Sequence, residues 1–405
     1  MIKMAHTLAT AALLMTVATP ALAQDVRVRV NVDSKISREV TQELSEAARE
    51  AAIEVSQAVR SALGPELRRD FEGLGRNLAV ALDGLGEIDW DIDHWDVESW
   101  GQSQRSRATQ TDRETRRFSV GPAGQLDLET LSGDITIRPT SGNNIVVEIV
   151  RESRGTDDAA AKQGLARVVV ESEERGGRVT VKTRYPNGRS EYSVNVNYIV
   201  EAPAGTRIST QSISGNVTVN GITGELSVNT TSGDVEITGA TRLTSATAVS
   251  GDVTLRDVSA QGLLEASTVS GDVVLTGGKA RRVVLSSISG GVAARGIDAD
   301  EVTLKSTSDD VVFDGNLSAR GSYTFSSHSG DVRISISGQT GFSLEADTFS
   351  GSVRTDFPIK VTTLASRRSR ARTITGTFGD GSAVISATSF SGSVVVTKKS
   401  EHRRD

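Results

Sequence analysis

The chain has 405 residues, a formal net charge of −6 and no cysteine. The missing cysteines exclude disulfides and a lipid anchor on cysteine, and a weakly acidic chain without a basic stripe is a poor candidate for nucleic-acid binding. Aromatic residues make up only 4 % of the chain and glycine is frequent, at 39 residues, so thin and regularly turning β-layers fit this composition better than one thick core.

The first 23 residues have the pattern of a secretory signal peptide. Lys3 gives a positive start, an apolar stretch follows from Leu8 to Val17, and Ala21-Leu22-Ala23 supplies small residues for cleavage. The apolar stretch is shorter than the roughly 20 residues that span a bilayer, and the alternative is a buried N-terminal helix. We expect cleavage before Gln24, export to the periplasm or the cell surface, and no integral membrane segment in the mature chain.

Residues 24–98 predict a small N-terminal region. Apolar and polar residues alternate over 26–32, which indicates a strand, and apolar residues recur every three or four positions over 36–63 and 67–82. The second pattern predicts a helical hairpin broken at Gly64-Pro65. Its apolar stripes need a partner, and self-association through the hairpin is one interpretation.

A strand rich in acid and tryptophan follows the hairpin at residues 87–98. Trp90, Trp95 and Trp100 fall within 11 residues, and exposed tryptophans commonly anchor interfaces. The alternative is an amphipathic strand packed on the hairpin. The polar residues 99–117 then predict a flexible linker.

From residue 118 to 397 a turn motif recurs about every 20 residues. It is Ser-Gly-Asp or a close relative, and it begins at Ser132, Ser214, Ser232, Ser250, Ser270, Ser289, Ser308, Ser329, Ser350 and Ser391. The 82-residue step after Ser132 indicates an insertion, and the 41-residue step before Ser391 corresponds to about two repeats. Glycine permits a positive φ, and Asp or Ser can bond nearby amides, so each motif predicts a tight turn.

Apolar residues alternate with polar ones on both sides of each turn, which is the period of a strand with one buried face. Each repeat therefore predicts a rung of strand, turn and strand, and stacked rungs would bury their apolar faces in one long core. The predicted fold is mainly β: a β-solenoid of stacked two-strand rungs with an N-terminal α-helical hairpin. A helical insertion is expected near 155–166 and a basic tail at 398–405.

The units SGDVTL and SGDVVL, which begin at Ser250 and Ser270, resemble a bacterial β-strand-repeat domain of unknown function that carries the label "putative adhesin". Asp356-Phe357-Pro358 and the later stretch TITGTFGDGSAVISATSFSGSV resemble the closing part of that domain. The resemblance covers residues 118–397. It implies a stacked β fold and an envelope or surface location, and it brings no catalytic residue.

The third turn residue would form a column of carboxylates in the stack. Like charges one strand apart repel, and calcium prefers such oxygen ligands, so a cation site is one interpretation. The other is that Asp serves as a turn former, because Gly291 and Ser352 interrupt the column. The candidate metal ligands are Asp234, Asp252, Asp272, Asp310 and Asp331.

His328 precedes Ser329-Gly330-Asp331, which suggests a Ser-His-Asp arrangement. The repeat alignment instead predicts a packing position at the corner of the rung, and neither a catalytic residue nor a cofactor is expected. The aligned column holds Leu131, Ile213, Val249, Val269, Ile288, Phe349 and Phe390.

Four arginines near the end of the repeats predict an exposed basic loop. This loop is either solvated or a contact for anionic lipid head groups or phosphorylated glycans. The residues are Arg367, Arg368, Arg370 and Arg372.

The sequence favours a non-enzymatic protein of the cell envelope or surface, an adhesin-like binding or structural scaffold that presents an extended β face. Its partner would be an unidentified envelope protein or a glycan. One alternative is a polysaccharide-active β-solenoid enzyme, which should show clustered Asp, Arg or Lys in one or two turns and aromatic residues along a groove. No turn stands out in this way from the sequence. Another alternative is an envelope signalling or assembly protein that acts through the helical hairpin.

Overall fold

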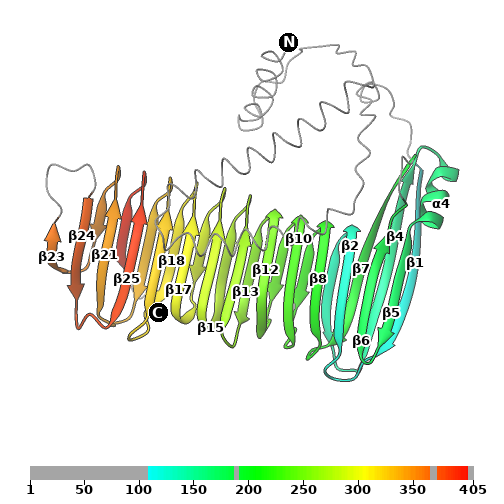
Figure 1. Cartoon of the computed structure of the whole chain (residues 1–405), viewed down its shortest axis with the longest axis horizontal. Coiled ribbons are helices and arrows are strands. Elements are labelled where there is room, and N and C mark those ends of the chain that lie inside the picture. The colour runs from blue at the N-terminus through cyan, green and yellow to red at the C-terminus, as the bar shows by residue number, and fades with distance from the viewer. Residues whose placement is uncertain (1–107, 187–190, 365–371, 400–405) are drawn as a thin grey trace, which may run out of the picture. The chain divides into compact units, whose positions relative to one another are not determined.

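A computed structural model describes residues 108–186, 191–364 and 372–399 (Figure 1). The predicted signal peptide, helical hairpin and acidic-aromatic strand lie outside the described residues. So do the first part of the predicted linker, Arg367, Arg368 and Arg370, and residues 400–405 of the basic tail.

The described residues form 26 strands and one helix and belong to one compact unit. The helix is α4 (Asp158–Arg167), and none in these residues is long and apolar enough to cross a membrane. The strands are β1 (Ala108–Ser119), β2 (Gln125–Ser132), β3 (Ile135–Thr140), β4 (Asn144–Gly155), β5 (Val169–Arg175), β6 (Arg178–Arg184), β7 (Tyr192–Pro203), β8 (Arg207–Ser214), β9 (Val217–Asn220), β10 (Glu225–Ser232), β11 (Val235–Thr238), β12 (Arg242–Ser250), β13 (Val253–Ser259), β14 (Leu263–Thr268), β15 (Val273–Ser287), β16 (Val292–Arg295), β17 (Asp298–Ser306), β18 (Val311–Asn316), β19 (Ser322–Ser327), β20 (Val332–Ser337), β21 (Phe342–Thr348), β22 (Val353–Thr355), β23 (Lys360–Leu364), β24 (Arg372–Phe378), β25 (Ala383–Ser389) and β26 (Val394–Lys398).

Successive rungs pair strand to strand in parallel. The first strands of the rungs form one column of the sheet, and the second strands form another. β8 pairs with β10 so that Ile208 lies opposite Leu226, and β9 pairs with β11 so that Val217 lies opposite Val235. The mainly β, solenoid-like stack of rungs that the repeat predicted is therefore confirmed.

Both columns bury alternate side chains in one hydrophobic cluster. The predicted inward positions face this cluster: Leu226, Val235 and Ile237 have no exposed surface, and Val353 in an outer rung is partly buried. Burying one such side chain is worth about 1.5–3 kcal/mol. Because the same positions recur in each rung, neighbouring rungs share one continuous core.

Antiparallel strands close the N-terminal end of the stack. After β3 the chain passes through β4, α4, β5, β6 and β7 before the regular rungs resume at β8. β6 and β7 pair in parallel with β2 and β3, whereas β5 pairs antiparallel with β6, and β1 and β7 pair antiparallel with β4. This excursion accounts for the long step after Ser132, and it contains a helix where the sequence predicts one near 155–166.

The linker prediction for 99–117 is wrong for residues 108–117, which form most of β1. β1 pairs with β4 and carries its charges in matched positions: Arg113 lies 2.7 Å from Glu148, and Asp112 pairs with Arg151. Its polarity suits a strand at the margin of the sheet, because charged side chains discourage pairing with another chain. The polar, mixed-charge residues 108–117 therefore form part of a strand and not a linker.

The C-terminal end departs from chain order. β25 lies between β19 and β21, and β26 lies between β20 and β22, so the last rung of the sequence is inserted between two earlier rungs (Figure 1). β24 then pairs antiparallel with β21, and β23 pairs antiparallel with β24, which closes this end. Among its described residues, the step before Ser391 therefore holds two closing strands, β23 and β24, in place of a second regular rung.

Candidate functional site

Each Ser-Gly-Asp corner brings successive backbones closer together than a side chain permits. At Gly251 φ is +145°, and a Cβ atom there would lie 2.2 Å from the carbonyl oxygen of Gly233 in the preceding rung. Gly215 meets the same restriction against Gly133. Glycine is required both by its φ and by this close approach.

The third corner residue bonds one rung to the next. The Asp234 Oδ1 atom accepts a hydrogen bond from the Asp252 backbone N–H at 2.9 Å, and Asp252 Oδ1 accepts one from Asp272 at 2.8 Å. We call this series the corner ladder. Its side-chain acceptors are Asp134, Asn216, Asp234, Asp252, Asp272, Asp310 and Asp331.

All five candidate metal ligands belong to the corner ladder, and each uses one oxygen for an amide of the neighbouring rung. In the part of the chain that the structure describes, no three acidic or histidine side chains gather closely enough to hold a metal ion. Cation binding by this column stays a prediction. The ladder favours the interpretation of Asp as a turn former.

A column of buried hydroxyls forms a second ladder that the sequence reasoning missed. Four residues before the third corner residue, Ser287 Oγ donates to the carbonyl oxygen of Gly271 at 2.8 Å, and Ser306 Oγ donates to that of Gly290 at 2.8 Å. The recurrence of Ser or Thr at this position was the available signal. Other donors of this kind are Thr268, Ser327, Thr348 and Ser389.

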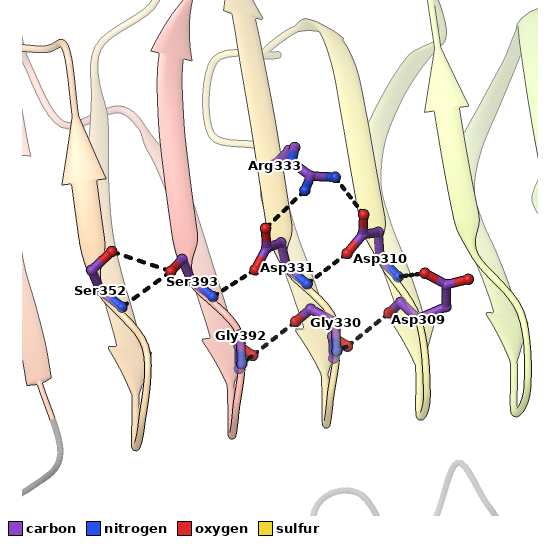
Figure 2. Close-up of polar contacts among 10 residues, drawn as sticks. Asp309, Asp310, Gly330, Asp331, Arg333, Ser352, Gly392 and Ser393 are labelled. Carbon is purple, nitrogen blue, oxygen red and sulfur yellow. Dashed lines mark hydrogen bonds and ion pairs between the residues drawn. The ribbon is translucent and has the colours of Figure 1, made fainter.

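Two C-terminal corners carry extra charge (Figure 2). Asp309 stands where the other corners have glycine, and its Oδ1 atom accepts from the Asp310 backbone N–H at 2.7 Å. Arg333 on β20 donates to Asp310 and, at 2.8 Å, to Asp331. The hydrogen bond to Asp310 raises the pKa of Arg333 above its usual range. Three carboxylates and one guanidinium leave these corners with net negative charge.

Three aromatic rings lie on the outside of the C-terminal corners. The ring centroids of His328 and Phe390 are 4.8 Å apart, and those of Phe390 and Phe349 are 4.9 Å apart, with interplanar angles of 7° and 5°. Phe349 is 41 % exposed, Phe390 is 46 % exposed, and His328 is also exposed. We call these three residues the aromatic stack.

The aromatic stack corrects one prediction. The alignment places His328, Phe349 and Phe390 in one corner column, and the structure does bring them together, but as surface residues and not as packing residues. Parallel strands lie about 4.8 Å apart, so side chains of one column meet at stacking distance. The sequence reasoning could not place Phe390 between His328 and Phe349, because this order arises only from the insertion of β25 between β19 and β21.

Of the other candidate interaction residues, the structure describes only Arg372. Trp90, Trp95 and Trp100 lie outside the described residues, as do three of the four arginines. Arg372 begins β24, where its backbone lies opposite Thr348. The acidic-aromatic strand and the arginine loop therefore stay predictions.

Solved bacterial structures resemble this chain at low identity. A protein from Bacteroides fragilis described as a "putative adhesin" is 14 % identical, with a TM-score of 0.33, over 71 % of this chain and 97 % of that one. A "putative lipid binding protein" from Parabacteroides distasonis is 13 % identical, with a TM-score of 0.32, over the same shares of the two chains. A "putative cell adhesion protein" from Clostridium sporogenes is 7 % identical, with a TM-score of 0.18, over 72 % of this chain and 100 % of that one.

Comparison with curated proteins finds no match. The profile of the Toastrack DUF4097 family matches residues 124–397, which span the stack from β2 to β26. This range covers well over half of the chain and nearly all of the region in which the corner motif recurs. The chain therefore belongs to the Toastrack DUF4097 family.

Proposed function

We propose that the protein is an exported, non-enzymatic scaffold of the cell envelope that presents an extended β surface for binding. The observation that supports this most is a contrast along the corner. In the regular rungs the polar corner groups bond rung to rung, whereas the aromatic stack leaves large apolar rings on the surface. Exposed apolar groups of this kind mark interaction sites. Export rests on the predicted signal peptide.

Co-sedimentation with envelope fragments of the producing bacterium tests this proposal. We expect the full-length protein and a variant that lacks residues 24–101 to sediment with the fragments to the same extent, because the variant keeps β1 and the whole stack. If neither protein sediments, the binding role is wrong. If only the full-length protein sediments, the binding surface lies in residues 24–101, which favours assembly or signalling through the helical hairpin.

A polysaccharide-active enzyme is the second candidate. The C-terminal corners combine clustered Asp and Arg with aromatic residues, which is the pattern expected of such an enzyme. Glycoside hydrolysis requires one carboxyl group as an acid and a second as base or nucleophile. Asp310 and Asp331 each hold a backbone amide and Arg333 instead, which favours a structural role. Release of reducing ends from a glycan panel would favour the enzyme, and binding without release would favour the scaffold.

A further inference from the structure

We propose that the C-terminal corners bind an uncharged glycan chain along the aromatic stack. This inference rests on the proposed function and names its ligand class and its binding surface. The surface, which we call the corner strip, consists of the aromatic stack, the serines that follow the three rings, and the charged cluster of Figure 2. The serines are Ser329, Ser391 and Ser350, and the cluster is Asp309, Asp310, Asp331 and Arg333.

The aromatic stack is a flat apolar track with a regular repeat. Its rings follow one another at 4.8 and 4.9 Å and are almost parallel, so their exposed edges form one continuous strip across three rungs. This repeat is similar to the length of one hexopyranose unit in an extended chain. The C–H face of a sugar ring is apolar and can cover such a strip by dispersion and hydrophobic contact.

The corners that carry the rings also carry hydrogen-bonding groups. Each aromatic residue is followed directly by an exposed serine, so three hydroxyls accompany three rings. Asp310 and Asp331 accept one amide bond each and share Arg333, and a carboxylate has about four acceptor sites, so both keep capacity for sugar hydroxyls. Rings that are each followed by a hydroxyl group, with carboxylates in the corner of His328 and in the neighbouring corner, match a ligand with C–H faces and a hydroxyl rim.

The charge of the corner strip selects among ligands. At the His328 end of the stack Asp309, Asp310 and Asp331 outnumber Arg333, so a polyanion such as an acidic polysaccharide or an anionic lipid surface would be repelled there. A purely apolar protein surface would bury the serines and carboxylates without partners, which is unfavourable. An uncharged, hydroxyl-rich chain avoids both the charge repulsion and the burial of polar groups without partners.

The regular corners lack this combination. At the ring position they carry half-buried aliphatic side chains such as Val249, Val269 and Ile288. Binding should therefore be confined to the C-terminal rungs and not follow the whole stack.

Titration calorimetry of the full-length protein with cellohexaose, maltohexaose and mannohexaose tests the inference, with an acidic galacturonic acid hexamer as the charge control. We expect at least one uncharged hexamer to bind and the acidic one not to bind. Phe390→Ala removes the middle ring and Phe349→Ala an outer one. Each should weaken binding about tenfold, the loss expected when an interface anchor is truncated.

Val384→Ala is the matched control, because Val384 lies on β25, the strand that ends one residue before Phe390, and its side chain is 54 % exposed. It should leave affinity unchanged, and all three variants should melt at the temperature of the parent protein. The inference is overturned if no uncharged hexamer binds, if the acidic hexamer binds most tightly, or if both Phe variants keep full affinity. When envelope co-sedimentation persists despite such a result, the scaffold proposal stands and only the glycan assignment fails.

Discussion

The regular corners between Ser214 and Gly291 differ from the C-terminal corners in what their side chains do. In the regular corners glycine allows the backbones to approach, Asp or Asn bonds the next amide, and an aliphatic residue covers the corner. In the C-terminal corners the same ladders continue, but Asp309 replaces a glycine, Arg333 joins two carboxylates, and rings replace the aliphatic residues. One repeat can thus keep its stacking bonds while the residues at its outer positions differ.

Removing an aromatic ring from the core of a C-terminal rung should have the largest effect on stability. Phe313 is fully buried, lies 5.2 Å from Phe325 between ring centroids, and stands opposite Ala294 of the neighbouring rung. Phe313→Ala should lower the free energy of unfolding by about 3–5 kcal/mol, because the smaller side chain leaves a cavity. Urea denaturation measures this. A loss below about 1 kcal/mol would show that the C-terminal rungs do not share a packed core.

The regular corners should be nearly as sensitive to one added methyl group. Gly251→Ala forces a Cβ atom against the Gly233 carbonyl at a positive φ, and we expect a loss of roughly 3 kcal/mol. Gly262→Ala is the matched control, since a Cβ there meets nothing within 4 Å, and should change stability by less than about 0.5 kcal/mol. Equal melting temperatures for the two variants would contradict the close approach of the corners.

Removing one acceptor from the corner ladder should have a moderate effect. Asp252→Ala leaves the Asp272 amide without its partner and should cost about 1–2 kcal/mol, whereas Asp252→Asn keeps an acceptor oxygen and should cost less than half as much. Thermal unfolding of both variants measures the difference. If Asn is as damaging as Ala, the charge of Asp252 matters more than its hydrogen bond.

Replacing Glu265 on β14 should have a small, pH-dependent effect on stability. Burial raises the pKa of its carboxyl group above the usual range, so the folded state favours the protonated form. The stability that comes from protonation is therefore present below the unfolded pKa and is lost as the pH rises through the folded pKa. Glu265→Gln should raise the melting temperature slightly at pH 7 and leave it unchanged near pH 4.

Glu174→Gln, at an exposed position of β5, is the control for this change and should have no effect at either pH. A Glu265→Gln variant that is less stable than the parent protein at pH 7 would contradict this prediction. Desolvation would then not be the main influence on the pKa of Glu265.

The smallest expected effect is that of calcium. Because each carboxylate of the corner ladder already holds an amide, a titration to millimolar calcium should leave the melting temperature unchanged. A rise of several degrees would establish the cation site that the Asp column suggested.

Most of the fold could be predicted from the local periodicity of the sequence. The positions of Leu226 and Val235 were predictable because strands alternate and each rung repeats the same pattern. The order of the rungs was not predictable, because any two rungs of this kind can stack on each other. Only the structure shows that the corner at 391–393 lies between the corners at 329–331 and 350–352. The place of Phe390 between His328 and Phe349 depends on that order, so the middle ring of the aromatic stack could not be assigned from the alignment.

Cysteine cross-linking tests the rung order most directly, since the natural chain has no cysteine to interfere. Thr388 pairs with Ser326 on one side and with Asp347 on the other. Paired cysteines at 326 and 388, or at 347 and 388, lie within the Cα separation that a disulfide requires and should cross-link on mild oxidation, whereas those at 326 and 347 should not. Efficient cross-linking of 326 to 347, with none to 388, would mean that the rungs stack in chain order and that Phe390 does not lie between His328 and Phe349.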